Sequence, residues 1–221
     1  MSKIKVILIS LSVWMLAACA GSRGPATLPS GEPAYDDAAI EASYYMQQLK
    51  VIKKDSLKAV ETTDWLKFRK EFLKCKLSQP KRFGITGQEA VMNLARKNGD
   101  SKQELKVAQE LLDVDFTNIS AHYAIVSNPS TDTTVKEFHK QIIMAILNSI
   151  RNSGKGTSPQ NAMYVINIGE EYDFILLGGL KPTGQALVEE NGRQYDLMKA
   201  VDEEGRNYQF YFDVTDFFGH Y

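Results

Sequence analysis

The chain has 221 residues, with 26 Lys and Arg against 27 Asp and Glu, and a formal net charge of −1. This near-neutral balance excludes the strongly basic surface by which most proteins bind nucleic acid, so we expect no nucleic-acid partner. Two cysteines are too few for a disulfide-stapled fold, and the length is sufficient for one domain or two small ones with a hydrophobic core.

Residues 1–18 have the layout of a signal peptide. Lys3 and Lys5 precede an apolar run over residues 6–18, and small alanines come directly before Cys19. The run is shorter than the about 20 apolar residues that span a bilayer, so we expect a cleaved leader and not a transmembrane helix. A buried structural cysteine is the alternative interpretation of Cys19.

Leu16-Ala17-Ala18-Cys19 resembles the lipobox of bacterial lipoproteins. The resemblance implies that Cys19 is the lipid attachment site, with cleavage before it and acyl chains such as palmitate on the new N-terminus. Two or more acyl chains hold a protein stably on a membrane, so the expected partner is the membrane of a bacterial cell envelope. Ala20, in place of Asp, implies the outer membrane, facing the periplasm. Residues 19–34 contain several Gly, Pro and Ser and are predicted to be a disordered tether.

Residues 35–152 are predicted to form a helical region, because apolar residues recur there every three to four positions. Capping-box patterns at 86–89 and 101–104 mark two helix starts. Asn98-Gly99 and Asn128-Pro129 mark two helix ends. The expected helices cover residues 39–52, 65–73, 86–98, 101–112, 119–126 and 134–150.

Residues 153–221 are predicted to form an antiparallel β region, because the apolar period changes to two after Gly156. Asn191-Gly192 is the strongest hairpin signal, since both residues tolerate the positive φ that a tight turn requires. The expected strands cover residues 163–168, 172–177, 185–189, 195–201 and 208–214. The predicted fold class is therefore α+β, with N-terminal helical pairs followed by a C-terminal antiparallel β meander.

Charge divides between the two regions. Residues 50–110 contain fifteen Lys or Arg against eight Asp or Glu, whereas residues 160–221 contain four against eleven. A basic helical surface on a tethered protein can lie against anionic lipid headgroups. Ordinary solvated helix surfaces are the alternative interpretation.

No segment carries a strong catalytic or cofactor motif, and no cofactor is expected. His122 and His139 fall on predicted helices without a metal-binding spacing, so we expect packed imidazoles and no metal site. Glu170 and Glu171 precede Tyr172 at the start of a predicted strand. Consecutive strand residues point to opposite faces, so these two carboxylates are not expected to share a proton or a metal ion.

Three segments resemble the landmarks of a bacterial family of domains of unknown function, the 4919-type family: "DFTNISAHYAI", "SIRNSGKGTSPQNAMYVINIGEEY" and "YQFYFDV". The resemblance covers residues 64–214. It implies a helical part followed by a β part, and it brings no activity and no catalytic residues. The resemblance implies an acidic residue between Gly154 and Gly156, and this chain has Lys155 there. The difference argues against ion binding in the loop around these glycines. Residues 93–108 and "LLDVDFTNISAHY" resemble degenerate tetratricopeptide-like helical pairs.

Two functional hypotheses follow. The first is a non-enzymatic binding or assembly module that contacts an envelope protein or polymer through the groove between helices and sheet. The second is an envelope hydrolase, or a small-ligand or metal-dependent enzyme, that uses His122, His139 or the cluster from Glu170 to Asp173. The candidate binding residues are His122, Tyr123, His139, Glu170, Glu171 and Tyr172.

Overall fold

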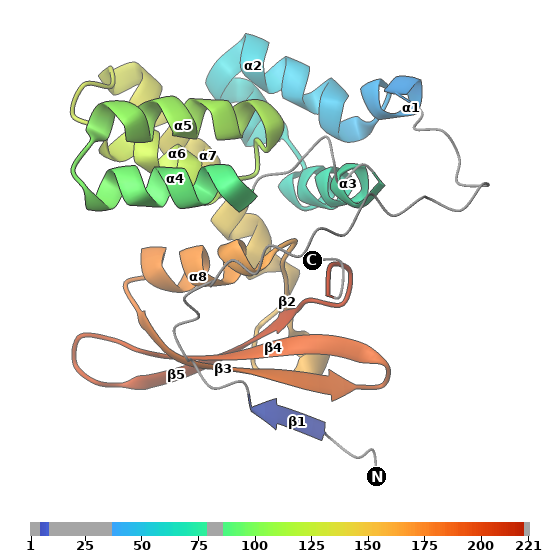
Figure 1. Cartoon of the computed structure of the whole chain (residues 1–221). Helices are drawn as coiled ribbons and strands as arrows, with labels where there is room; N and C mark the ends of the chain where they lie inside the picture. The colour runs from blue at the N-terminus through green and yellow to red at the C-terminus, as the bar shows by residue number, and fades with distance from the viewer. Residues whose placement is uncertain (1–4, 9–36, 79–85, 219–221) are drawn as a thin grey trace, which may run out of the picture.

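The computed structural model describes residues 5–8, 37–78 and 86–218. A layer of helices lies on one side of the molecule and a β-sheet on the other, with the short helix α8 between them (Figure 1). The helices are α1 (Asp37–Glu41), α2 (Tyr44–Thr62), α3 (Trp65–Ser78), α4 (Thr86–Lys97), α5 (Ser101–Val114), α6 (Ile119–Ser127), α7 (Thr133–Ser153) and α8 (Ile168–Leu177). Cys19 and the predicted tether lie outside the described residues.

The helix starts follow from side chains that bind the first backbone N–H groups. The Asp100 carboxylate accepts a hydrogen bond from the backbone N–H of Gln103, and the Asn118 side chain does the same for Ala121. Gly99 ends the preceding helix with a φ of 71°. Each predicted helix has a counterpart in the structure, but several bounds differ. The first is split into α1 and α2 and continues to Thr62, the second continues to Ser78, and the last covers Thr133–Ser153. The cap of α5 is Asp100, one residue before the predicted Ser101.

The strands form one mixed sheet in the order β1-β3-β4-β5-β2, and the edge strand β1 lies within the segment predicted to be a cleaved leader. The predicted Asn191-Gly192 turn joins two antiparallel neighbours, and its residues adopt φ values of 53° and 76°. The meander prediction was wrong at one edge, because β2 runs parallel to β5. The strands are β1 (Lys5–Leu8), β2 (Met163–Tyr164), β3 (Lys181–Glu190), β4 (Arg193–Val201) and β5 (Asn207–Asp213).

Two predicted strands differ from the structure. The strand expected over 163–168 is reduced to the two residues of β2, and the strand expected over 172–177 is part of the helix α8. The Asn167 side chain accepts a hydrogen bond from the Glu170 backbone N–H and starts this helix. A short apolar run is compatible with either a strand or a buried helix, and here the cap and two acidic residues in the first turn favour the helix.

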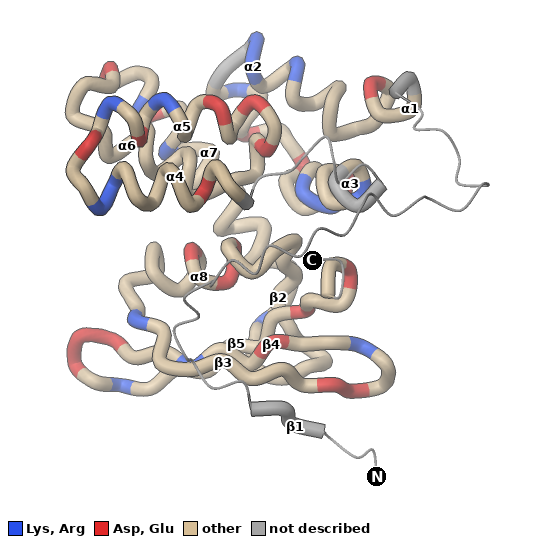
Figure 2. The backbone as a smooth tube through the Cα atoms, viewed as in Figure 1, with Lys and Arg blue, Asp and Glu red and all other residues tan. Residues whose placement is uncertain are grey.

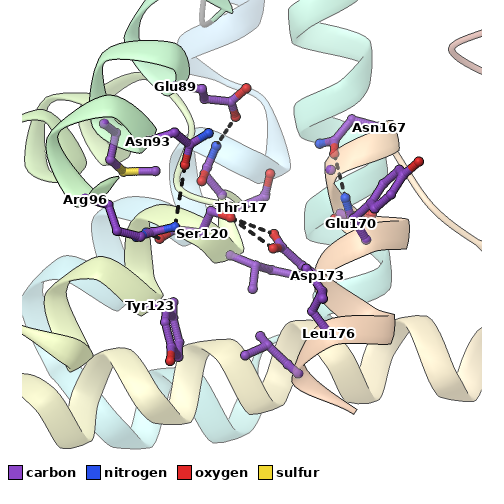
Figure 3. Close-up of a pocket in the computed structure, with 16 residues that line it drawn as sticks. Glu89, Asn93, Arg96, Thr117, Ser120, Tyr123, Asn167, Glu170, Asp173 and Leu176 are labelled. Atoms are coloured by element: carbon purple, nitrogen blue, oxygen red, sulfur yellow. Dashed lines mark hydrogen bonds between the residues drawn. The ribbon is translucent and has the colours of Figure 1, made fainter. Parts of the chain in front are cut away.

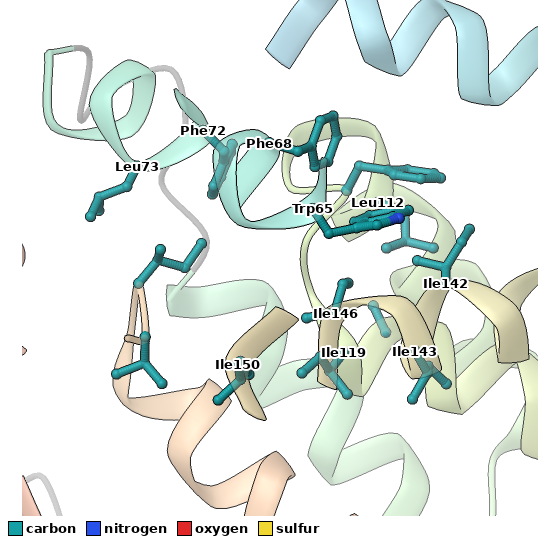
Figure 4. Packing of buried hydrophobic residues seen from close by; sticks show 14 of the residues in the cluster. Trp65, Phe68, Phe72, Leu73, Leu112, Ile119, Ile142, Ile143, Ile146 and Ile150 are labelled. Carbon is teal, nitrogen blue, oxygen red and sulfur yellow. The ribbon is translucent and has the colours of Figure 1, made fainter. Parts of the chain in front are cut away.

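The hydrophobic core is continuous from the helical layer to the sheet. Aromatic residues of α3, including Phe68 and Phe72, pack against the isoleucine stripe of α7, which includes Ile146 and Ile150 (Figure 4). On the sheet, Phe212 is buried under α8, where the Phe174 ring lies edge-on to it at 5.8 Å. None of the described helices is long and apolar enough to cross a membrane.

A buried ion pair also joins the layers. The Arg69 guanidinium on α3 donates two hydrogen bonds to the Glu170 carboxylate on α8, at 2.8 and 2.5 Å, and both side chains are almost fully buried. It also donates to the Tyr164 carbonyl oxygen at 2.9 Å and to the Ser149 hydroxyl at 3.0 Å. Arg69 therefore connects α3 to α7, β2 and α8.

The surface charges divide as expected, with Lys and Arg frequent on α2 and α3 and Asp and Glu gathered at the sheet turns (Figure 2).

Candidate functional site: a cavity between α4, α6 and α8

A cavity of about 520 Å³ lies where the helical layer meets α8. Its walls come from α4, from the start of α6 with the residues before it, and from α8 (Figure 3). This volume falls within the range of about 300–1,000 Å³ that is typical of small-ligand sites. Its lining residues belong to helices and to the residues that precede them, and none belongs to a strand, whereas the sequence hypothesis placed the binding site in a groove between helices and sheet.

Two helix N-termini open toward the cavity, and asparagine side chains cap both. Asn118 accepts from the Ala121 N–H at 2.8 Å through Oδ1, and its Nδ2 donates to Glu89 Oε1 on α4 at 2.6 Å. Asn167 caps α8 through the Glu170 N–H at 2.9 Å. The caps satisfy backbone donors and fix the position of Glu89 relative to α6.

Ser120 and Asp173 form the polar contact between α6 and α8. The Ser120 hydroxyl lies 2.9 Å from one Asp173 carboxylate oxygen and 3.2 Å from the other. The pKa of Asp173 is raised to about 6, mainly by burial and to a smaller extent by the negative charges of Glu170 and Glu89. The hydrogen bond from Ser120 and the positive charge of Arg96 lower this pKa and only partly offset the burial.

Arg96 on α4 contributes a positive charge that forms an ion pair with Glu104 on α5. Its Nε donates to Glu104 Oε1 at 2.6 Å. Its two terminal nitrogens lie 3.5 Å from the Asn93 side-chain oxygen and the Ser120 carbonyl oxygen. The arginine therefore braces α4 against α5 and α6.

Apolar side chains form the opposite side of the cavity. Tyr123 of α6 is 43% exposed, and Leu176 and Leu177 of α8 are 54% and 37% exposed. Figure 3 shows Tyr123 and Leu176 beside each other, below the polar group of Ser120 and Asp173. Large apolar side chains that stay exposed next to partly buried polar groups are typical of a binding surface.

The two predicted histidines lie outside this cavity. The His122 and His139 rings approach each other with 2.6 Å between their Nδ1 atoms, and His122 Nε2 lies 3.1 Å from the Phe116 carbonyl oxygen. A carbonyl oxygen only accepts hydrogen bonds, so His122 Nε2 carries the hydrogen of that contact. A neutral imidazole has one N–H group, so His122 Nδ1 is then an acceptor, and a neutral His139 donates to it through its own Nδ1. Burial lowers the pKa of His122 to about 3 and that of His139 to about 4.

The predicted acidic cluster is divided between environments. Glu170 binds Arg69 and lines the cavity, whereas Glu171 is fully buried and is grouped with Asp196 on the sheet. Burial raises the pKa of Glu171 well above its ordinary value, and the negative charge of Asp196 adds to the effect. Adjacent helix residues point about 100° apart, so the two carboxyls separate even though they lie on a helix and not on a strand.

Tyr172 connects the cavity wall to the sheet. Its hydroxyl donates to the Gln185 side-chain oxygen at 3.1 Å, and the Gln185 amide donates to Asp196 at 2.5 Å. Across the described part of the chain, no group of three or more His, Cys, Asp and Glu side chains is placed to hold a metal ion.

The sequence interpretation missed several polar residues of the cavity, among them Glu89, Arg96 and Ser120. Glu89 was noted only as part of a capping box, and its side chain instead accepts a hydrogen bond from Asn118. The available signal was the spacing of Ser120 and Tyr123, which lie three residues apart and therefore on one side of α6.

The fold and the cavity define an α+β protein with a polar, ligand-sized cavity at the junction of its helices with its sheet region. Residues 86–221 match the model of a family described as a domain of unknown function (DUF4919), and the chain belongs to this family. No curated protein and no solved structure matches the chain. The matched segment begins at α4, so Arg69 lies before it and its partner Glu170 lies within it.

Proposed function

We propose that this protein is a lipid-anchored cell-envelope protein whose folded part is a non-enzymatic binding module. Its binding site is the cavity between α4, α6 and α8, and its partner is a segment of an envelope protein or polymer. One observation carries the proposal: the exposed Tyr123, Leu176 and Leu177 border a cavity that contains the partly buried carboxyl of Asp173. Apolar surface provides affinity, and a few fixed polar groups provide orientation.

The anchor is proposed from the lipobox, with Cys19 as the modified residue and the outer membrane, facing the periplasm, as the location. Intact-mass analysis of the mature protein is expected to find the chain starting at Cys19 with added acyl chains. Replacing Cys19→Ser is expected to leave an unlipidated protein that keeps its leader. An unmodified Cys19 thiol in the wild-type protein contradicts the anchor and leaves the cavity proposal standing.

The binding site is tested by placing a photo-crosslinking amino acid at the position of Tyr123 and irradiating intact envelopes. Met144 on α7 is the matched control position, because it is 45% exposed and does not line the cavity. We expect a discrete crosslinked envelope component at Tyr123 that is absent at Met144. Equal crosslinking at the two positions contradicts the assignment of the cavity as the binding site.

The helices α4 to α7 are proposed to be a degenerate tetratricopeptide-like scaffold. In support, each of these helices packs against the next in chain order. Such pairs stack to bury a shared apolar stripe and leave surfaces for binding a partner.

A second candidate function is an envelope hydrolase, and the chemistry of Asp173 favours it. A carboxyl whose pKa is about 6, hydrogen-bonded to a hydroxyl inside a cavity, has the properties of a general acid or base. If this function holds, Asp173→Asn abolishes turnover of an envelope polymer while the protein stays folded. Turnover that is unchanged in the Asn variant excludes this role.

A further inference from the structure

The charges that face the cavity are not balanced. Glu89 receives a hydrogen bond from the neutral Asn118 amide, and Asp173 receives one from the neutral Ser120 hydroxyl. Among the described residues, neither carboxylate has a Lys or Arg nitrogen within ion-pairing distance. The cavity therefore carries negative potential on its polar side.

The two arginines near the cavity do not remove this imbalance. Arg69 is fully committed to Glu170, the Tyr164 carbonyl and Ser149. Arg96 is paired with Glu104, and only its weaker contacts reach toward the cavity. Each arginine charge is thus matched by one carboxylate, and the charges of Glu89 and Asp173 remain.

The other side of the cavity suits a long apolar stem. Leu176 and Leu177 expose aliphatic surface, and the exposed Tyr123 offers an aromatic ring, whose face attracts cations. A ligand that reaches both sides has an alkyl chain along the leucines and a positive charge between the aromatic ring and the carboxylates.

We propose that the cavity binds a primary ammonium group carried on an alkyl chain, the chemistry of a lysine-type side chain within a peptide or polymer. This inference rests on the proposed binding function and specifies its ligand class. The ammonium donates hydrogen bonds to Asp173 and Glu89, and the alkyl chain covers Leu176 and Leu177. Lys-type cations have three donors and no acceptor, which matches the acceptors that carboxylates present.

Binding of a cation is expected to depend on pH through Asp173. The charged groups that face this carboxyl are Glu170 on its own helix and Glu89 and Arg96 on α4, while Glu171 and Asp196 lie on the sheet side of α8. The pKa of Asp173 is about 6 without ligand, so about 10% of it is ionised at pH 5 and about 90% at pH 7. A cation binds the ionised form, so its affinity rises about tenfold over this interval.

The test uses calorimetric titration of the full chain in detergent with three probes of equal backbone: the acetylated methylamides of lysine, norleucine and glutamate. We expect the lysine probe to bind about tenfold or more tightly than the norleucine probe at pH 7, since only lysine forms charge-assisted hydrogen bonds. This difference in affinity between the lysine and norleucine probes is expected to be smaller at pH 5. Tighter binding of the norleucine or glutamate probe, or no binding of the lysine probe, overturns the cation assignment.

Two variants and a control locate the effect. Asp173→Asn keeps an acceptor for Ser120, and Glu89→Gln keeps one for Asn118, so both variants are expected to fold. Each is expected to bind the lysine probe about tenfold more weakly than the wild type does. Asp173→Asn is also expected to remove the pH dependence. Asp113→Asn is the matched control, because its carboxylate is 77% exposed and does not line this cavity. Equal weakening by the control overturns the assignment.

The outcomes separate this inference from the proposed function. Crosslinking at Tyr123 with no preference for the lysine probe leaves the binding module and rejects its ligand class. Failure of both experiments rejects the cavity as a binding site.

Discussion

The buried pair of Arg69 and Glu170 provides the sharpest test of how this fold is held together. Replacing Arg69→Met keeps a long apolar side chain and removes all of the guanidinium hydrogen bonds to Glu170, Tyr164 and Ser149. Glu170 then stays buried with one backbone donor, the Ile166 N–H at 2.9 Å.

The expected cost is large because one charge loses its partner without reaching water. Removal of one member of a buried ion pair typically lowers the free energy of unfolding by about 3–5 kcal/mol. Domains of this kind have a total stability of about 5–15 kcal/mol, so the variant is expected to be close to its folding threshold. The assay is urea denaturation of the full chain, followed by circular dichroism.

Two further variants test the reasoning. The double variant Arg69→Met with Glu170→Met removes both charges and is expected to recover much of the loss. Lys70→Met is the control on the same helix, because Lys70 is exposed and its ammonium lies 4.4 Å from the centre of the Tyr164 ring, so a change of about 1 kcal/mol or less is expected. A loss below about 1 kcal/mol for Arg69→Met, or a double variant no more stable than the single one, refutes the argument.

Three other outcomes are expected from the titratable groups and from the loop after α7. The folded-state pKa values of His122 and His139 are about 3 and about 4, below the ordinary 6.5, so their contribution to stability is complete above pH 6.5 and is lost toward pH 4. Between pH 6.5 and pH 4, the free energy of unfolding is expected to fall less in a double His→Phe variant than in the wild type. An equal fall in both proteins contradicts the assignment. The pKa of Glu171 is raised in the folded state, so the wild type loses stability as the pH rises above 4.5, the ordinary pKa of a glutamate side chain. Glu171→Gln is expected to stabilise the protein more at pH 7 than at pH 5, and an equal gain at both argues against this cause. A Cβ at Gly154 would lie 2.1 Å from a backbone carbonyl oxygen, so Gly154→Ala is expected to lower the melting temperature, whereas Gly184→Ala, with open space around it, is expected to change it little.

Much of the fold was predictable because its signals are local. Caps such as Asn118 and breakers such as Gly99 act within one helical turn, and the Asn191-Gly192 turn defines its hairpin through two backbone angles. The helix α8 was missed because its apolar residues also fit a strand. The decisive signal was Asn167, which is followed by acidic residues in the first turn.

The site was less predictable, because its contacts join residues that are far apart in the chain. Ser120 meets Asp173 across 53 positions, and Arg69 meets Glu170 across 101. Nothing in the spacing of these residues indicates that they touch. The histidines at 122 and 139 were singled out by residue type, and the structure places them against each other and outside the cavity.

The position of α8 has a consequence for the kinetics of binding. One face of this ten-residue helix is fixed by an ion pair with α3, and another is packed on the sheet through Phe174. The wall that carries Asp173 therefore cannot shift without breaking that pair. A partner must fit a preformed shape, so association is expected to proceed in a single step whose rate rises linearly with ligand concentration.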